Sequence, residues 1–352
     1  MTSAREALLA RLAEVASVPE RRRIASSIVD FESRDALVDR VIALTERLAG
    51  SAPCALLHAS FSMGAVFGWA LEDGTRVLLK QHPRQAALAP LEASYALMDA
   101  LAAIGFPCPM LRAGPLDDGG ALVVLMGWLD ASETPPSSTD AELRARACAF
   151  ARLVRVGSAN PHAGALARAP GIAKPWPPPH SPVFDFEASR EGAEAIDAIG
   201  AWTADALTAR NPSIVVAHAD WTAHNVWLDG DAVSAVYDWD SLHREDHAVS
   251  VGVAALASGF DTRRAFAPPP TAAWVEGFIR AYRDASDALS DDDARAAKVA
   301  ALRTYAYLAR CQHALAWARR ADAPYPFAAG LERFARELDA RREASGRSRR
   351  RS

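Results

Sequence analysis

The segment 214–241 constrains the fold more than any other part of this 352-residue chain. It holds a short β-branched run at 214–217, a second apolar run at 226–228 and an alternating run at 232–237. The dipeptide Asp-Gly at 229–230 favours a two-residue hairpin turn. We therefore expect one strand followed by a β-hairpin, whose two open ends lie beside each other.

Polar residues stand at the ends of these runs. His218-x-Asp220 follows the first run, Asn225 precedes the second, and Asp238 follows the third. In a phosphoryl-transfer site, one carboxylate orients and deprotonates an acceptor hydroxyl, while an amide oxygen and a second carboxylate hold Mg²⁺ against nucleotide phosphates. Asp and Asn also favour ordinary turns. Their placement around a strand and a hairpin nevertheless predicts a site for phosphoryl transfer.

Composition narrows the classes of protein and partner. A chain of this length with 50% hydrophobic residues can bury a large core, and we expect two lobes. The net charge of -4 gives no footprint for nucleic acid, so the expected partner is a small molecule. No apolar run reaches the roughly 18 residues of a membrane helix, and the charged start of the chain is unlike a signal peptide. Four scattered cysteines suit a reducing compartment, and we expect a cytoplasmic protein.

The order of helical and strand-like patterns predicts four regions. Residues 1–50 form a helical extension, in which Ser33 is the expected N-cap of a helix that Gly50 ends. The N-lobe, 51–130, combines strand-like patterns at 61–71, 75–80 and 121–129 with a helix at 86–104. A linker at 131–140 opens the C-lobe, 131–342, and the basic tail at 343–352 is expected to be disordered. The C-lobe is mainly helical, over 141–156, 191–210, 250–259, 272–286, 291–320 and 328–343.

Lysine is unusually rare in this chain. Of 39 basic residues, only Lys80, Lys174 and Lys298 are lysines. Lys80 ends a strand-like run, and a lysine there in an arginine-rich chain favours a specific role. The alternative is an ordinary surface lysine at the end of a strand.

With these motifs in this order, the chain resembles the aminoglycoside phosphotransferase and choline kinase-like family of the protein-kinase-like superfamily. The motifs are His218-x-Asp220 with Asn225, and Tyr237-Asp238-Trp239-Asp240. The resemblance implies a bilobal α+β fold with a small β-rich N-lobe and a larger, mainly helical C-lobe. It also implies a Mg²⁺-dependent transfer of the γ-phosphoryl group of ATP to a hydroxyl of a small molecule, an antibiotic or a metabolite.

The family pattern assigns roles to the catalytic segment. By resemblance, Asp220 is the catalytic base and His218 braces its loop, while Asn225 and Asp238 bind the metal ion. Two departures stand out: Ala219 replaces a usual glycine, and Ser250 replaces an aspartate that commonly follows. The second departure puts in question how the catalytic loop is anchored.

The resemblance also implies nucleotide-binding residues in the N-lobe. Lys80 matches the lysine that contacts the phosphates, and Glu92 matches the acid that pairs with it. Ser62 and Gly64 lie in the hairpin expected to cover the phosphates, at 60–68. Met126 and Trp128 lie in the expected hinge, where the adenine binds.

Two other functions compete with the kinase. A non-catalytic nucleotide-binding module would have the same fold, with the N-terminal helices as a partner surface or in a homodimer. A metal hydrolase would use a cluster of His and carboxylate side chains, since these are ligands of zinc. Its candidates are His218, Asp220, His224, His243, Asp246 and His247.

Overall fold

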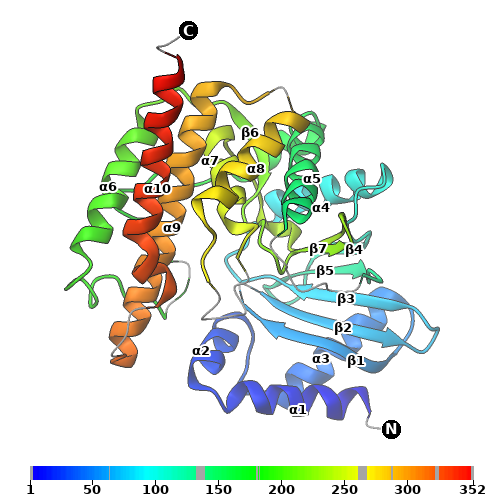
Figure 1. The fold of residues 1–352 in the computed structure, drawn as a ribbon. Coiled ribbons are helices and arrows are strands. Elements are labelled where there is room, and N and C mark those ends of the chain that lie inside the picture. The colour runs from blue at the N-terminus through cyan, green and yellow to red at the C-terminus, as the bar shows by residue number, and fades with distance from the viewer. Residues whose placement is uncertain are drawn as a thin grey trace. The chain divides into compact units, whose positions relative to one another are not determined.

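The computed structural model describes residues 3–62, 64–131, 139–179, 181, 183–260, 268–286, 288–321 and 325–349. The chain divides into two compact units (Figure 1). The first comprises residues 1–130 with 164–166, and the second comprises 131–163 with 167–352. Most of the expected linker lies outside the described residues.

The first unit is built on a five-stranded antiparallel sheet with the strand order β1-β2-β3-β5-β4. The prediction of one strand over 61–71 is wrong, because β1 ends at Phe61 and a turn at Ser62 and Gly64 precedes β2. The strand β4 was not predicted, because it contains Pro115, which cannot donate to a ladder. The strands are β1 (Pro53–Phe61), β2 (Ala65–Leu71), β3 (Arg76–Gln81), β4 (Leu111–Asp117) and β5 (Leu122–Gly127).

Three helices of the N-terminal extension, α1 (Ala4–Ala16), α2 (Pro19–Ile28) and α3 (Arg34–Ala49), lie along one face of this sheet (Figure 1). Their apolar residues and those of β1, β2, β3 and β5 form one buried cluster, which includes Leu8, Val38, Phe67 and Trp69. A further helix, α4 (Leu88–Ala103), contacts β4. The extension is therefore an integral layer of the first unit.

The ends of α3 test two sequence predictions. Gly50 ends the helix in the left-handed region with φ 76°, as predicted. Ser33 precedes the helix, but its side chain makes no capping hydrogen bond. Its ψ of 61° departs from the extended conformation that turns an N-cap oxygen toward the helix N–H groups.

The second unit combines helices with two small antiparallel sheets. The predicted strand and hairpin are confirmed: β6 (Ile214–His218) pairs with β9 (Leu242–Asp246), and β7 (Val226–Asp229) pairs with β8 (Ala232–Val236). The helices are α5 (Asp140–Ser158), α6 (Glu194–Thr208), α7 (His247–Ala257), α8 (Ala272–Ala285), α9 (Asp291–Arg319) and α10 (Pro326–Arg349), with the short 3-10 helix η2 (Trp239–Ser241). The residues of a second 3-10 helix, η1 (Pro161–Ala165), are divided between the two units.

Helix α10 continues to Arg349, through most of the segment that was expected to be disordered. Its sequence is rich in Ala, Arg and Glu, which are strong helix formers and favour continuation of the helix. Among the described residues, no helix is both long enough and apolar enough to cross a lipid bilayer.

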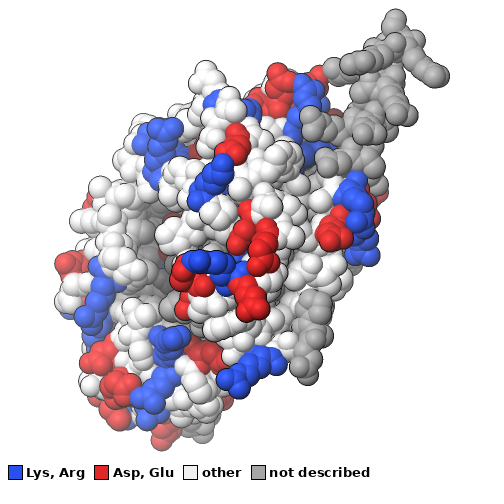
Figure 2. All heavy atoms as spheres, turned by 90° about the vertical axis from the view of Figure 1, so that its left-hand side faces the viewer, with Lys and Arg blue, Asp and Glu red and all other residues white. Residues whose placement is uncertain are grey.

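On the face drawn in Figure 2, acidic and basic side chains are interspersed rather than gathered into a patch of one sign.

Helix α7 is buried at the centre of the second unit and packs against α8 and α9. An aromatic cluster stands beside it: Phe150 of α5 contacts Trp221, Phe278 and Tyr282 at ring-centroid distances of 5.1, 6.3 and 6.0 Å. Because Trp221 directly follows Asp220, this cluster ties the predicted catalytic loop to the core.

The close approach of α7 and α9 at Gly252 leads to a stability prediction. A β-carbon at Gly252 would overlap the carbonyl oxygen of Ala297 and stand 2.7 Å from the β-carbon of Ala300. We expect Gly252→Ala to lower the free energy of unfolding by about 3 kcal/mol, because the backbone of α9 has to move. Denaturant unfolding measures the effect. Gly171→Ala is the control, since its β-carbon would meet no atom within 4 Å, and equal stability of the two variants would contradict the packing argument.

Candidate active site

The hairpin places two of the predicted residues beside each other. Asn225 directly precedes β7, and Tyr237 directly follows β8. The Tyr237 N–H donates to the Asn225 carbonyl at 2.9 Å, which extends the ladder by one pair. Asp238, the next residue, is therefore adjacent to Asn225 at the open end of the hairpin.

His218 connects the catalytic loop to the end of this hairpin. It is 2% exposed at the end of β6. Its Nε2 bonds the carbonyl oxygen of Tyr237 at 2.9 Å, and its Nδ1 accepts the N–H of Asp220 at 3.2 Å. An Nε2 that donates and an Nδ1 that accepts define a neutral imidazole with its proton on Nε2. The side chain acts as a brace between residues 220 and 237.

Asp220 and Asn225 contact each other directly. The amide nitrogen of Asn225 donates to the Asp220 carboxylate at 2.7 Å and to the Asp220 carbonyl at 3.0 Å. Asn225 is 7% exposed, whereas the Asp220 side chain is 39% exposed and open to an incoming molecule. Because the amide nitrogen makes both bonds, the amide oxygen is the atom through which Asn225 would ligate a cation.

Asp238 has an unusual backbone conformation for a residue other than glycine. Its φ of 65° and ψ of 48° lie in the left-handed region, directly before η2. The hydroxyl of Ser241 donates to its Oδ2 at 2.8 Å. Trp239, the next residue, is buried, and its indole N–H donates to the Val236 carbonyl at 2.8 Å. Strained conformations of this kind concentrate at functional sites, where the surrounding packing enforces them.

In the first unit, the predicted nucleotide lysine is held under the turn between β1 and β2. Lys80 is 5% exposed. The turn is closed by the Ser62 N–H, which donates to the Gly64 carbonyl at 3.0 Å. A β-carbon at Gly64 would stand 2.8 Å from the Gln81 carbonyl oxygen and 3.5 Å from Cε of Lys80. Glycine is thus required for the turn to lie this close to Lys80.

The structure does not join Glu92 to Lys80. Glu92 lies in the first turn of α4 and is exposed, while Leu91, Ser94 and Tyr95 occupy the buried face. Within the described part of the chain, its carboxylate makes no hydrogen bond or ion pair. The predicted lysine–glutamate pair is therefore not formed here, because helix α4 turns this position toward solvent.

The predicted hinge residues lie at the end of β5. Met126 is buried and paired with Leu78 and Leu111. The Trp128 N–H donates to the Arg76 carbonyl at 3.1 Å, and a β-carbon at Gly68 would stand 2.6 Å from the Trp128 ring. The roles of Met126 and Trp128 toward adenine stay predictions.

Arg146 of α5 was not identified from the sequence. It is 1% exposed and donates from Nη1 to the carbonyl of Val226, the residue after Asn225, at 2.8 Å. Its own carbonyl accepts the indole N–H of Trp221 at 3.3 Å. Burial lowers the Arg146 pKa to about 10, partly offset by the charge of Glu142. The signal in the sequence was an arginine on the apolar face of the helix over 141–156.

The buried Ser250 does not anchor the predicted catalytic loop. Its Oγ has no hydrogen-bond partner among the residues that the structure describes. The Ala219 N–H instead donates to the Ser241 carbonyl at 3.0 Å, and His218 accepts the next N–H. The loop backbone is thus held without the aspartate that the family often has at this position.

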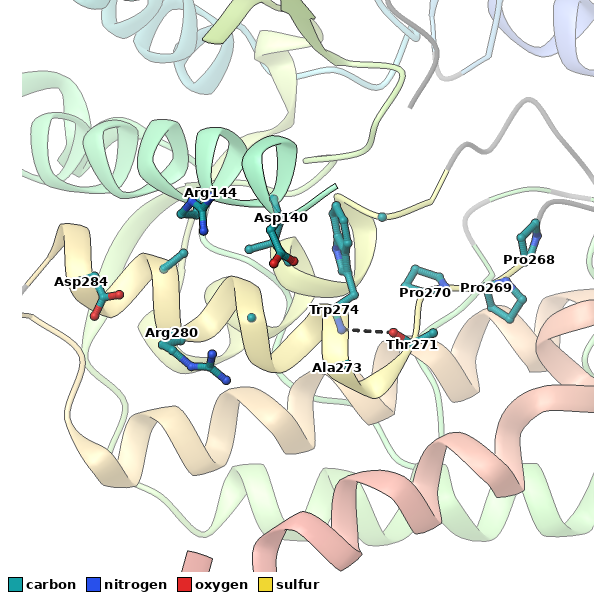
Figure 3. A pocket seen from close by; sticks show the side chains of 14 residues that line it. Asp140, Arg144, Pro268, Pro269, Pro270, Thr271, Ala273, Trp274, Arg280 and Asp284 are labelled. Carbon is teal, nitrogen blue, oxygen red and sulfur yellow. Dashed lines mark hydrogen bonds between the residues drawn. The ribbon is translucent and has the colours of Figure 1, made fainter. Parts of the chain in front are cut away.

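Two cavities of the second unit differ in their relation to these residues. One of about 440 Å³ is lined by residues just before Asp220 and just after Asp238, among them His218, Asp240, His243, Glu245 and Ser250. Burial lowers the pKa of His243 and raises the pKa of Glu245. The other, of about 620 Å³, lies where α5 meets α8 and is lined by Arg144, Trp274 and Arg280 (Figure 3). None of the predicted site residues lines it, whereas His218 lines the smaller cavity.

The His and carboxylate residues of the alternative metal hydrolase are separated into other interactions. His224 shares a hydrogen bond with the Thr222 hydroxyl at 2.9 Å, and His247 shares one with the Tyr282 hydroxyl at 2.7 Å. Asp246 caps α7 by accepting the Ala248 N–H at 2.9 Å. In the described ranges, no three His, Cys, Asp or Glu side chains gather as a metal site. The structure gives no support to the hydrolase.

A model of the phosphotransferase enzyme family (APH) matches residues 60–299. The chain belongs to this family. No curated protein matches the sequence of this phosphotransferase, but solved structures share its fold. Amicoumacin kinase hAmiN in complex with AMP-PNP, Ca²⁺ and Ami has a TM-score of 0.58 and 11% identity over 81% of this chain and 88% of its own. Spectinomycin phosphotransferase in complex with ADP and spectinomycin has a TM-score of 0.53 and 12% identity over 85% of this chain and 93% of its own. Choline kinase from Cryptosporidium parvum Iowa II has a TM-score of 0.50 and 12% identity over 88% of this chain and 97% of its own.

These similarities confirm three sequence predictions. The phosphotransferase has the protein-kinase-like fold, with a five-stranded sheet and N-terminal helices in one part and a mainly helical second part. Family membership confirms the resemblance inferred from the motifs and makes the protein a small-molecule kinase.

Proposed function

We propose that this protein transfers the γ-phosphoryl group of ATP to a hydroxyl of a small molecule, with Asp220 as base. The observation that carries the proposal is the contact between Asn225 and the Asp220 carboxylate at 2.7 Å, with Asp238 adjacent across the hairpin. An acceptor-activating carboxylate and two oxygen ligands would then lie on one short segment of backbone. Lys80 would contact the nucleotide phosphates.

Asp220 would orient the acceptor hydroxyl and take its proton. The hydroxyl oxygen forms a bond to the γ-phosphorus as the bond from that phosphorus to the β–γ bridging oxygen breaks, and the nucleotide leaves as ADP. Asn225 holds the carboxylate in place through its amide nitrogen, and His218 fixes the backbone of the loop through the Asp220 N–H. The chain thus contributes mainly position and charge, which is how phosphoryl transfer is generally catalysed.

The donor set near the hairpin fits a magnesium ion. Mg²⁺ prefers oxygen ligands and binds through one or two carboxylates together with substrate phosphates. Asn225 offers its amide oxygen and Asp238 its carboxylate. When bound, the ion would neutralise charge on the phosphates of the nucleotide.

The cavity of about 440 Å³ supports an acceptor of moderate size. Asp240, Glu245 and Arg168 all lie in its wall, so the lining carries both signs of charge and offers polar contacts to an acceptor. The similar structures are described with amicoumacin-type and spectinomycin ligands or as a choline kinase. Antibiotics and metabolites are both consistent with this pocket.

The test is the release of ADP from ATP and Mg²⁺ in the presence of aminoglycosides, macrolides, amino alcohols, sugars and homoserine. Turnover with one acceptor class would support the proposal and identify the substrate. Binding of Mg·ATP without turnover across a broad panel would favour the non-catalytic nucleotide-binding module. Absence of nucleotide binding would refute the nucleotide site altogether.

The two hydrogen bonds of the His218 side chain lead to a separate prediction for kcat. We expect His218→Gln to lower kcat by about 10- to 100-fold, because Asp220 loses the bond that fixes its loop. The KM for nucleotide should change little, since His218 is not among the predicted nucleotide-binding residues. His313→Gln is the matched control, because His313 also bonds a carbonyl, that of Glu191 at 3.0 Å, but on α9. Equal kcat values for the two variants would remove the bracing role from His218.

A further inference from the structure

Strand β3 carries the predicted nucleotide lysine and turns its alternate residues toward opposite faces of the sheet. Val77 and Leu79 point to the face covered by the N-terminal helices and belong to their apolar cluster. Gln81 follows the same alternation. Lys80 and His82 point to the other face, where His82 shares a hydrogen bond with the hydroxyl of Tyr95 on α4 at 3.1 Å. The end of β3 is thus held from both sides.

Gln81 is the polar contact between β3 and the N-terminal helices. It is 3% exposed, and its amide nitrogen donates to the carbonyl of Ile28, the last residue of α2, at 3.2 Å. Its amide oxygen accepts from Nη2 of Arg40 on α3 at 2.7 Å. The buried amide therefore has one partner on each of two helices of the extension.

Arg40 is held in turn by an ion pair. Its Nε donates to Asp118, the residue after β4, at 2.8 Å. A guanidinium can make both bonds at once because its donors lie in a rigid, planar fork. Arg47 lies further along α3 and also pairs with Asp118, at 3.2 Å. Among the described residues, Arg47 makes no bond to Gln81, and this is the contact that distinguishes Arg40 from Arg47.

We propose that Arg40 is a positioning residue for nucleotide binding, which acts on Lys80 through Gln81. The inference rests on the proposed function, in which Lys80 contacts the nucleotide phosphates. Loss of Arg40 leaves the Gln81 oxygen buried without its donor, and the end of β3 then relaxes to satisfy it. Lys80 is the neighbouring residue on this strand end, and the turn at Gly64 packs on both. A shift of the strand end therefore moves the lysine relative to the phosphates.

This assignment gives the N-terminal extension a role inside the nucleotide-binding unit. The apolar residues of α3, among them Leu37, Val38, Val41 and Leu44, are buried in the cluster with the sheet. That face is consequently not available to a membrane or to a second copy of the chain. Most of the exposed residues of α3 are charged. Arg40 is the charged residue of this helix that contacts Gln81 of β3.

The experiment compares Mg·ADP dissociation constants of full-length variants. Arg40→Met keeps much of the aliphatic stem and removes the guanidinium. We expect it to weaken Mg·ADP binding about fivefold, whereas Arg47→Met stays within about twofold of wild type. KM for the acceptor should be unchanged in both. If Arg40→Met does not fold, as judged by circular dichroism and thermal unfolding, Arg40→Lys and Arg47→Lys replace the pair, with at least about a twofold loss for the first only.

A double-mutant cycle separates positioning from general destabilisation. Lys80→Met should weaken Mg·ADP binding strongly, and Arg40→Met should add less than about twofold in its presence, because both act through the same contact. If the losses in Mg·ADP affinity of the two single variants multiply in the double variant, the inference is overturned. Equal effects of Arg40→Met and Arg47→Met on Mg·ADP affinity would overturn it as well. Neither result would contradict the proposed role of Lys80 in nucleotide binding. Wild-type affinity in Lys80→Met would overturn the proposed role of Lys80 and the inference with it.

Discussion

Replacement of Asp220 by asparagine should lower kcat by about 10²- to 10⁴-fold, the range that a positioned general base contributes. The variant keeps the size of the side chain and still offers an oxygen to the Asn225 amide. In the wild-type protein, this amide contacts the Asp220 carboxylate at 2.7 Å. It loses the ability to accept a proton. Affinity for Mg·ADP should change little, so the loss falls on the chemical step and not on nucleotide binding.

Steady-state kinetics with the acceptor identified from the panel, together with Mg·ADP titration, measures both quantities. Asp231→Asn is the matched control, since Asp231 is an exposed acid at the hairpin turn of the same segment. It should leave kcat within about twofold of wild type. An Asp220→Asn enzyme that retains more than a tenth of the wild-type kcat would show that this carboxylate is not the base.

The structure of the segment 214–241 was predictable from sequence because it depends on local signals. The hairpin depends on Asp229-Gly230 and the alternating residues around it, and β6 depends on a β-branched run. Such signals act over a few residues, so they also fixed Asn225 and Asp238 as neighbours. The bond from Asn225 to Asp220 is also local, but it was not predicted from the sequence.

Other features depend on contacts between distant parts of the chain, which no local pattern encodes. The absence of a bond to Glu92 follows from how α4 is rotated against the sheet, and Arg146 is recognisable only once the carbonyl of Val226 lies next to it. The role of Ser250 also needed the fold, because the Ser241 carbonyl does the anchoring. The connection of Arg40 to Gln81 spans 41 residues. The spacing of residues along the sequence does not predict contacts between residues that are this far apart.

The second large effect is expected at Asp238. Asp238→Asn should lower kcat on the order of 10²- to 10³-fold, as for removal of one group that stabilises charge on the reacting phosphates. The Mg²⁺ concentration needed for half-maximal activity should rise as well, because a neutral amide binds a hard cation less strongly than a carboxylate does.

Asparagine is the informative substitution at this position because of the backbone. Asp238 has φ 65°, and asparagine tolerates the left-handed region better than most residues, so Asp238→Asn removes the charge without adding strain. Alanine would change both at once. Asp229→Asn, at the other end of the same hairpin, is the control and should keep the Mg²⁺ dependence of the wild type. If Asp238→Asn also kept that dependence, the ion would have to be held by other residues, and the hairpin would serve the fold alone.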